Sequence, residues 1–147
     1  MTMTQSWTEQ VLASTTDEVK PVVRDRAAIR AGQTMLYPSA RLVDEYIRAI
    51  PEGECRDIAT LRRDLAARRG AFATCLPTLR DRLLAIAEAA FDELDDGALL
   101  QEVTPVWRVH VEHSDVLLRR LSFEPAFLLD LRASEHDHPV EIDRQAA

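Results

Sequence analysis

Apolar residues recur at helical spacing in two successive stretches near the middle of the chain. The first stretch follows Ser39, whose hydroxyl is a suitable helix cap, and ends in the turn at Gly53. The second follows Asp57, which is also a suitable cap, and stops at Gly70. The pattern therefore predicts two short amphipathic helices. Their core-facing positions are Leu42, Val43, Tyr46, Ile47 and Ile50 in the first helix and Ile58, Leu61 and Leu65 in the second.

A third helical stretch begins at Pro77-Thr78 and ends at Gly97. Either Thr78 caps this helix or Pro77 lies in its first turn, where a missing N–H is tolerated. Four acids crowd residues 92–96 at the other end, which is unfavourable for the helix dipole, so we expect that end to fray. Three short helices joined by tight connections predict a helix-turn-helix core. The apolar face of the third helix consists of Leu79, Leu83, Ile86, Ala90 and Leu94.

Residues 103–111 alternate between apolar and polar positions, which predicts a strand. Trp107 and Val109 would share one face of that strand, and Arg108 would lie on the other. A short closing helix is expected over residues 125–132. The predicted fold class is therefore mainly α with a small β wing.

The two ends of the chain carry little pattern. Residues 1–36 are rich in Thr, Ser, Gln and charges, which predicts a flexible N-terminal arm, with Trp7, Val11 and Leu12 as the side chains able to dock on the core. Residues 37–133 hold the predicted helices and strand and form the expected domain. Residues 134–147 are expected to be a polar C-terminal tail.

Composition agrees with a single globular domain. Of the 147 residues, 46% are hydrophobic and 29% are charged, so a core can form under a soluble surface. No apolar run approaches the roughly 20 residues that span a bilayer, and the N-terminus lacks the pattern of a secretory signal. Cys55 and Cys75 show no metal or redox spacing. We expect a cytoplasmic protein with reduced thiols and no membrane partner.

The net charge of −7 argues against indiscriminate binding to nucleic acid, but the charges are unevenly distributed. Residues 56–82 contain seven arginines and three acids, a local charge of +4, and the rest of the chain carries −11. Such a block is compatible with a positive DNA-binding face. It is also typical of a mixed, solvated helix surface, which is the more common arrangement.

One segment carries a resemblance to a known family. Thr104-Pro105-Val106-Trp107-Arg108-Val109 resembles the active-site segment of the alkylguanine-DNA alkyltransferases, whose hallmark reads Pro-Cys-His-Arg-Val. Ile50-Pro51-Glu52-Gly53-Glu54 resembles that family's turn after the first helix of its DNA-binding domain. Thr74-Cys75 followed by Pro77-Thr78 resembles the approach to the DNA-reading helix in alkyltransferase-like relatives. The resemblance implies a winged helix-turn-helix like the C-terminal domain of the alkyltransferases.

The same segment departs from the family at its reactive positions. Val106 occupies the position of the family's nucleophilic cysteine, and Trp107 occupies the position of its histidine. Pro105 and Arg108 are the same residues as in the family motif. Irreversible alkyl transfer needs an activated thiolate, so the resemblance implies a protein that is not an enzyme. The family's Thr-Tyr pair is replaced by Asp57-Ile58, and its intercalating arginine is not visible in register.

By the resemblance, DNA would meet the start of the third helix. Thr78, Arg80 and Arg82 are the candidate contacts there, and Arg62 and Arg63 on the preceding helix are further candidates. The competing interpretation is a capped, solvated helix start.

Trp107 raises a similar choice. It has the chemistry to stack on an extruded base, but its apolar neighbours favour a core tryptophan.

Metal and cofactor sites are not predicted. Two clusters contain side chains that could bind a metal, but both are short and lie in polar sequence. These clusters are His110, His113 and Asp115, and His136, Asp137 and His138.

The leading hypothesis is a non-catalytic, alkyltransferase-like protein that binds double-stranded DNA and recognises alkylated or distorted sites for a repair partner. One alternative is a winged-helix module that has lost DNA binding and contacts proteins instead. A transcription regulator is a third, and would need a dimer. A coherent positive face around Arg62, Arg63, Arg80 and Arg82 would favour DNA binding, whereas acids interleaved across it would favour protein contact.

Overall fold

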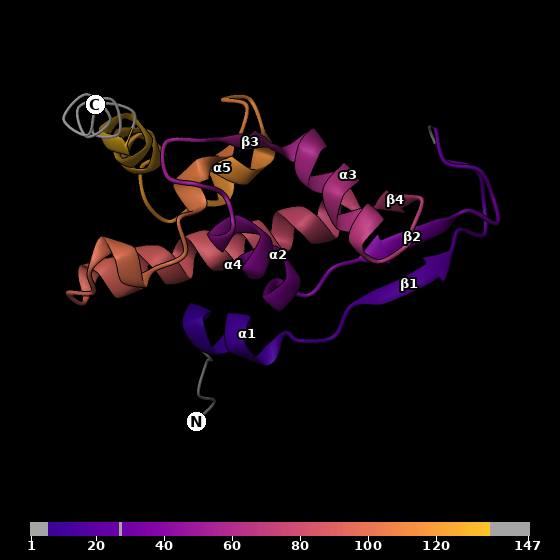
Figure 1. Ribbon diagram of the computed structural model, residues 1–147, viewed down its shortest axis with the longest axis horizontal. Helices are drawn as coiled ribbons and strands as arrows, with labels where there is room; N and C mark the ends of the chain where they lie inside the picture. Colours follow the sequence, from indigo (N-terminus) through magenta and orange to yellow (C-terminus); the bar gives the residue numbers. More distant parts are fainter. Residues whose placement is uncertain (1–5, 27, 136–147) are drawn as a thin grey trace, which may run out of the picture.

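A computed structural model describes residues 6–26 and 28–135 (Figure 1). The chain is mainly helical with two small sheets, which confirms the expected fold class at this level. The helices are α1 (Trp7–Ala13), α2 (Ala40–Arg48), α3 (Ile58–Arg68), α4 (Leu76–Asp95) and α5 (Val116–Arg120), with 3-10 turns η1 (Leu100–Glu102) and η2 (Val106–Arg108). Residues 126–135 are also helical. No helix in the described ranges is long and apolar enough to cross a membrane.

The strands form one sheet of three and one of two. The first sheet has the order β1 (Glu18–Pro21), β2 (Thr34–Tyr37) and β4 (Ala73–Thr74), with β1 antiparallel and β4 parallel to β2. In the second sheet β3 (Arg56–Asp57) pairs in parallel with β5 (Val109–His110). This second pairing brings residues 104–109, here called the candidate active-site segment because they resemble that of the alkyltransferases, beside the start of α3.

Helix α4 is the axis of the core (Figure 1). Its buried side chains face several directions, because α1, α2, α5 and η2 all pack against it. Pro77 lies in the first turn, as expected, but Cys75 rather than Thr78 is the N-cap residue. The expected fraying is wrong: the helix continues to Asp95, since Leu94 packs on the core and the closing turn forms its backbone bonds.

Local caps fix the two preceding helices as the sequence predicts. The Ser39 hydroxyl accepts from the Leu42 N–H at 3.1 Å, and the Asp57 carboxylate accepts from the Thr60 N–H at 2.8 Å. Gly70 follows α3 with a φ of 65°, a left-handed conformation that glycine adopts without strain.

The N-terminal part of the chain contains regular elements that pack on the rest of the protein. Helix α1 packs along α4, with Trp7 and Val11 against the core, and the Thr8 hydroxyl donates to Glu93 at 3.1 Å. The expectation for Leu12 is wrong: this side chain is 72% exposed, because it lies on the outer face of α1. Strands β1 and β2 form a hairpin in which Leu36 is fully buried. The short apolar groups in residues 6–36 are enough to dock these elements, although they show no long periodicity.

The expected strand over residues 103–111 is wrong except at β5. Pro105 fixes a turn, in which the Val106 N–H bonds to the Thr104 carbonyl at 2.7 Å and the segment continues as a 3-10 turn. Residues 134 and 135 of the expected polar tail belong to the helix at 126–135. The remainder of that tail lies outside the described residues.

Candidate functional site

The arginines of α3 are only partly available for a ligand. Arg62 donates from Nε to the Thr74 carbonyl at 3.1 Å, and the Thr74 hydroxyl returns a bond to the Arg62 carbonyl at 2.7 Å. Arg63 is exposed and lies 3.4 Å from the Asp64 carboxylate. Arg62 therefore fastens α3 to β4, and Arg63 shares its surface with an acid.

The arginines at the start of α4 make contacts within the protein. Arg80 Nη2 pairs with Asp115 at 3.1 Å, and Arg80 Nε is buried without a hydrogen-bond partner in the described part of the chain. Arg82 donates from Nε to the Pro38 carbonyl at 3.0 Å. Between them, Asp81 pairs with Arg120 at 2.8 Å. These contacts tie α4 to α5 and to the entry of α2.

Thr78 lies beside the same helix start, where its hydroxyl donates to the Cys75 Sγ at 3.2 Å. The five residues predicted to contact DNA thus do not form one set of free cations. Acids stand beside Arg63 and Arg80, which is the interleaved arrangement expected of a surface for protein contact.

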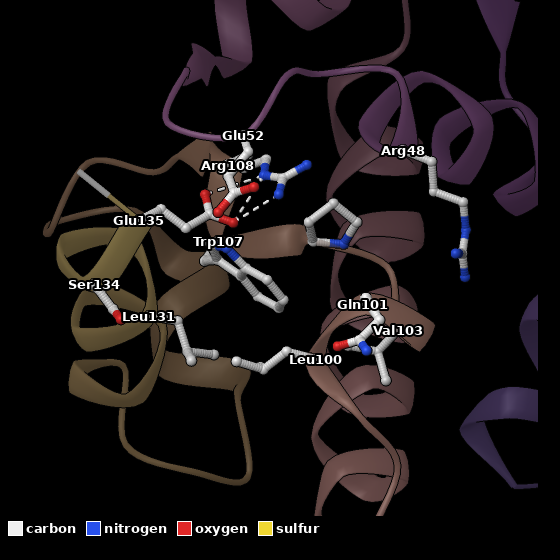
Figure 2. A pocket seen from close by; sticks show the side chains of 11 residues that line it. Arg48, Glu52, Leu100, Gln101, Val103, Trp107, Arg108, Leu131, Ser134 and Glu135 are labelled. Carbon is white, nitrogen blue, oxygen red and sulfur yellow. Dashed lines mark hydrogen bonds and ion pairs between the residues drawn. The ribbon is translucent and has the colours of Figure 1, made fainter. Parts of the chain in front are cut away.

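The candidate active-site segment lines a pocket of about 510 Å³ (Figure 2). One wall comes from the end of α2 and the turn after it, a second from residues 100–108, and a third from the helix at 126–135. Both apolar and polar side chains line it. The lining residues are Arg48, Glu52, Leu100, Gln101, Val103, Pro105, Trp107, Arg108, Leu131, Ser134 and Glu135.

Arg108 and Glu135 form the polar centre of this pocket wall. Arg108 Nη2 lies 2.6 Å from Glu135 Oε1, and Nη1 donates to the Ile50 carbonyl at 2.9 Å. Their side chains are only 15% and 13% exposed. Burial alone would raise the pKa of Glu135, but the bonds from Arg108 outweigh it, so the pKa lies below its usual value and the carboxylate stays charged.

A second arginine fastens the helix at 126–135 to the same segment. Arg132 donates to the Trp107 carbonyl at 2.8 Å and to the Val109 carbonyl at 3.0 Å. Two arginines therefore join elements far apart in the chain around residues 105–109. Their role is structural in this arrangement, since their donors are directed at groups of the protein itself.

The two positions at which the chain departs from the alkyltransferases are core positions. Val106 is buried and faces the apolar residues Leu83 and Leu117. Trp107 is 3% exposed, and its indole N–H forms no hydrogen bond with any described residue. The N–H lies on the side of Glu135, outside hydrogen-bond geometry, and this approach helps to lower the pKa of that carboxyl (Figure 2). Burial agrees with a core tryptophan that also forms one edge of the pocket.

The histidine clusters give no metal site in the described part of the chain. His110 Nδ1 lies 3.2 Å from the Arg132 guanidinium, a cation that would repel a metal ion. His136, Asp137 and His138 lie outside the described residues.

Sequence reasoning missed several residues of the pocket. Glu135 was placed in a polar tail, although it lies four residues after Leu131, the spacing that brings both to one helix face. Arg48 and Leu100 gave no signal, because they lie at the end of α2 and in η1, which are far apart in the chain.

Comparison with known proteins adds no relative: no family model, no curated protein and no solved structure matches this chain.

Proposed function

We propose that this chain is a non-catalytic protein-interaction module built on a variant of the winged helix, and that a partner polypeptide occupies the pocket at Trp107 and Arg108. The observation that carries the proposal is the use of Arg80 and Arg82, predicted to contact DNA, in contacts within the protein. A surface whose cations are already paired attracts phosphate weakly.

The environment of α4 supports the same conclusion. A helix that reads DNA leaves one face free to enter a groove. Here the first turns of α4 bury Leu79, Leu83 and Leu84, and the helix is covered by α1, α2 and α5. The order α2, α3, α4 with a short strand before α4 supports the winged-helix relationship, while the buried surface of α4 supports a different use of it.

The pocket has the chemistry of a small interface. Leu100 and Leu131 provide apolar surface (Figure 2), as does Pro105. Glu52 and Arg48 add opposite charges, and Arg48 also pairs with Asp44 at 2.9 Å. An apolar centre within a polar rim is the usual anatomy of a protein interface. The volume is enough for one or two side chains of a partner.

DNA binding remains a second candidate because of a different set of cations. Arg24, Arg26 and Arg30 are all exposed in the turn that joins β1 to β2. Arg63 and Arg68 on α3 are also exposed. Contact with DNA would then involve the hairpin and α3 rather than the start of α4.

Duplex binding separates the two candidates. The protein is titrated against a labelled duplex with one alkylguanine and against the undamaged duplex, at two salt concentrations. We expect no preference for the lesion and no binding at physiological salt. Tighter binding to the lesion, with a salt slope reflecting about three or four phosphate contacts, would overturn the proposal. Equal binding to both duplexes that is lost in Arg24→Ala/Arg26→Ala/Arg30→Ala would instead support the second candidate.

Site-specific cross-linking tests the pocket directly. A photo-cross-linking residue is placed at Leu100 on the pocket rim, or at the exposed Leu12 as a control, in the cells that make the protein. One dominant protein adduct is expected from position 100 alone. Arg48→Glu should abolish this adduct, whereas Arg41→Glu, an exposed position on the same helix, should leave it. An adduct unchanged by Arg48→Glu would contradict the proposed site.

A further inference from the structure

A buried carboxylate lies on α4, away from the pocket. Glu88 is 2% exposed, and Ser122 donates to both of its oxygens: the N–H to Oε2 at 2.6 Å and the hydroxyl to Oε1 at 2.5 Å. A buried charge is strongly unfavourable unless donors compensate it. Ser122 therefore compensates the charge of Glu88, and Glu88 in turn fixes the position of Ser122.

Ser122 also lies in the connection between α5 and the helix at 126–135, which forms one wall of the pocket. The next residue, Phe123, stacks on Phe91 of α4 at 4.4 Å, and Phe127 meets Phe91 edge-on at 5.3 Å. The helix at 126–135 then continues to Leu131 and Glu135. The Glu88–Ser122 contact and the three phenylalanine rings thus anchor the near end of the helix that forms one side of the pocket.

The sequence around the serine is basic on one side and aromatic on the other. It reads Arg119-Arg120-Leu121-Ser122-Phe123. Arg119, Arg120 and Ser122 are exposed, and residues 121–124 lie outside helix and strand. Two guanidinium groups shortly before a serine, with a large apolar residue after it, form a substrate pattern of arginine-directed serine kinases, whose clefts pair the guanidinium groups with carboxylates.

We propose that Ser122 is a phosphorylation site and that its modification releases the helix at 126–135 from α4. The kinase transfers the γ-phosphoryl group of ATP to Ser122 Oγ: a new O–P bond forms, the bond between the γ-phosphorus and the bridging oxygen breaks, and ADP leaves. The hydroxyl proton passes to the catalytic base of the kinase. The phosphorylated oxygen can no longer donate to Glu88, and a group of charge near −2 then faces that carboxylate and the nearby Asp92. Like charges at this distance repel, so the anchor becomes unfavourable.

The structure also limits the access of a kinase to Ser122. The Ser122 hydroxyl is turned toward Glu88 and Arg120 pairs with Asp81, so a kinase acts on the segment when the two hydrogen bonds and this ion pair have opened. Glu88→Ala removes both acceptors and should raise the rate of phosphorylation in a protein that stays folded. Arg119→Ala should lower that rate, because the kinase loses one of its two cationic contacts.

The test uses the full chain with the catalytic subunit of an arginine-directed serine kinase and magnesium ATP. Mass spectrometry should find one phosphate on Ser122, absent from Ser122→Ala. Hydrogen exchange should then rise about tenfold or more for amides of residues 126–135, while amides in α3 keep their rate. A folded protein that takes no phosphate at Ser122, or takes it only at Ser114 or Ser134, would refute the site. A phosphate on Ser122 with unchanged exchange would refute the release.

Neither readout involves a partner, so both are independent of the proposed function. Only one consequence rests on it: opening of the pocket wall should change the yield of the adduct formed from position 100. If cross-linking finds no adduct in either state while exchange still rises, the proposed function fails and the release stands.

Discussion

Two arginine–carboxylate pairs in this molecule lie in very different surroundings. Arg63 and Asp64 on α3 are 3.4 Å apart and 74% and 36% exposed. Arg108 and Glu135 beside the pocket are 2.6 Å apart and only 15% and 13% exposed. Water screens the first pair, while the second is held in a fixed geometry by the Ile50 carbonyl.

The difference shows why arginine content is a weak guide to nucleic-acid binding in this chain. An exposed guanidinium remains available to phosphate, whereas a half-buried one is needed by the fold. Arg80, Arg82, Arg108 and Arg132 all belong to the second kind, because each donates to a carboxylate or a backbone carbonyl of the protein.

Arg108→Ala should have the largest effect on stability. The substitution leaves Glu135 half-buried without its cation and leaves the Ile50 carbonyl without its donor. We expect a loss of about 3 kcal/mol in the free energy of unfolding, measured by urea denaturation at neutral pH. Arg108→Lys keeps the charge but not the forked geometry and should lose less. A loss no larger than that of an exposed arginine, such as Arg41→Ala, would contradict this role.

Acid should weaken the same pair by protonating Glu135. Because the folded-state pKa lies below the usual value of 4.5, this pair contributes stability above pH 4.5 and loses it as the pH falls through the lower folded-state value. The difference in unfolding free energy between the wild type and Glu135→Gln should therefore be constant near neutral pH and shrink below pH 4.5. A difference that persists to strongly acidic pH would show that the charge of Glu135 is not what stabilises the pair.

Contacts between residues close together in the sequence could be predicted from the sequence, whereas contacts between distant residues could not. Ser39 and Asp57 were predicted as caps because each bonds an amide three residues ahead. The strand at 103–111 failed because alternation was given more weight than the turn that Pro105 imposes. The partner of Arg80 is 35 residues away and that of Arg82 is 44 residues away, so only the folded chain reveals that these cations are occupied.

Replacing Tyr46, which bonds to the exposed Arg63–Asp64 pair of α3, should change stability less than replacing Arg108. Its hydroxyl donates to Asp64 Oδ2 at 2.5 Å, and burial together with this bond raises the pKa of Tyr46 to about 12. Tyr46→Phe should lower the unfolding free energy by about 1 kcal/mol at neutral pH. Since the folded-state pKa is raised, the contribution is complete below pH 10 and is lost as the pH rises toward 12. Ultraviolet titration should lose its step near pH 12 in Tyr46→Phe and keep it in Tyr37→Phe.

Arg63→Ala should have the smallest effect, and this makes it the sharpest test of the contrast with Arg108. An exposed pair contributes roughly 0.2–1 kcal/mol at most, and salt screens it further, so urea denaturation should place this variant near the wild type. The same variant also tests whether Arg63 takes part in DNA binding. If Arg63 contacts phosphate, the slope of the logarithm of affinity against the logarithm of salt concentration should fall by about one unit. If the protein works through protein contacts, neither stability nor duplex binding should change, because Asp64 remains bonded to Tyr46 and no other group depends on the Arg63 guanidinium among the described contacts.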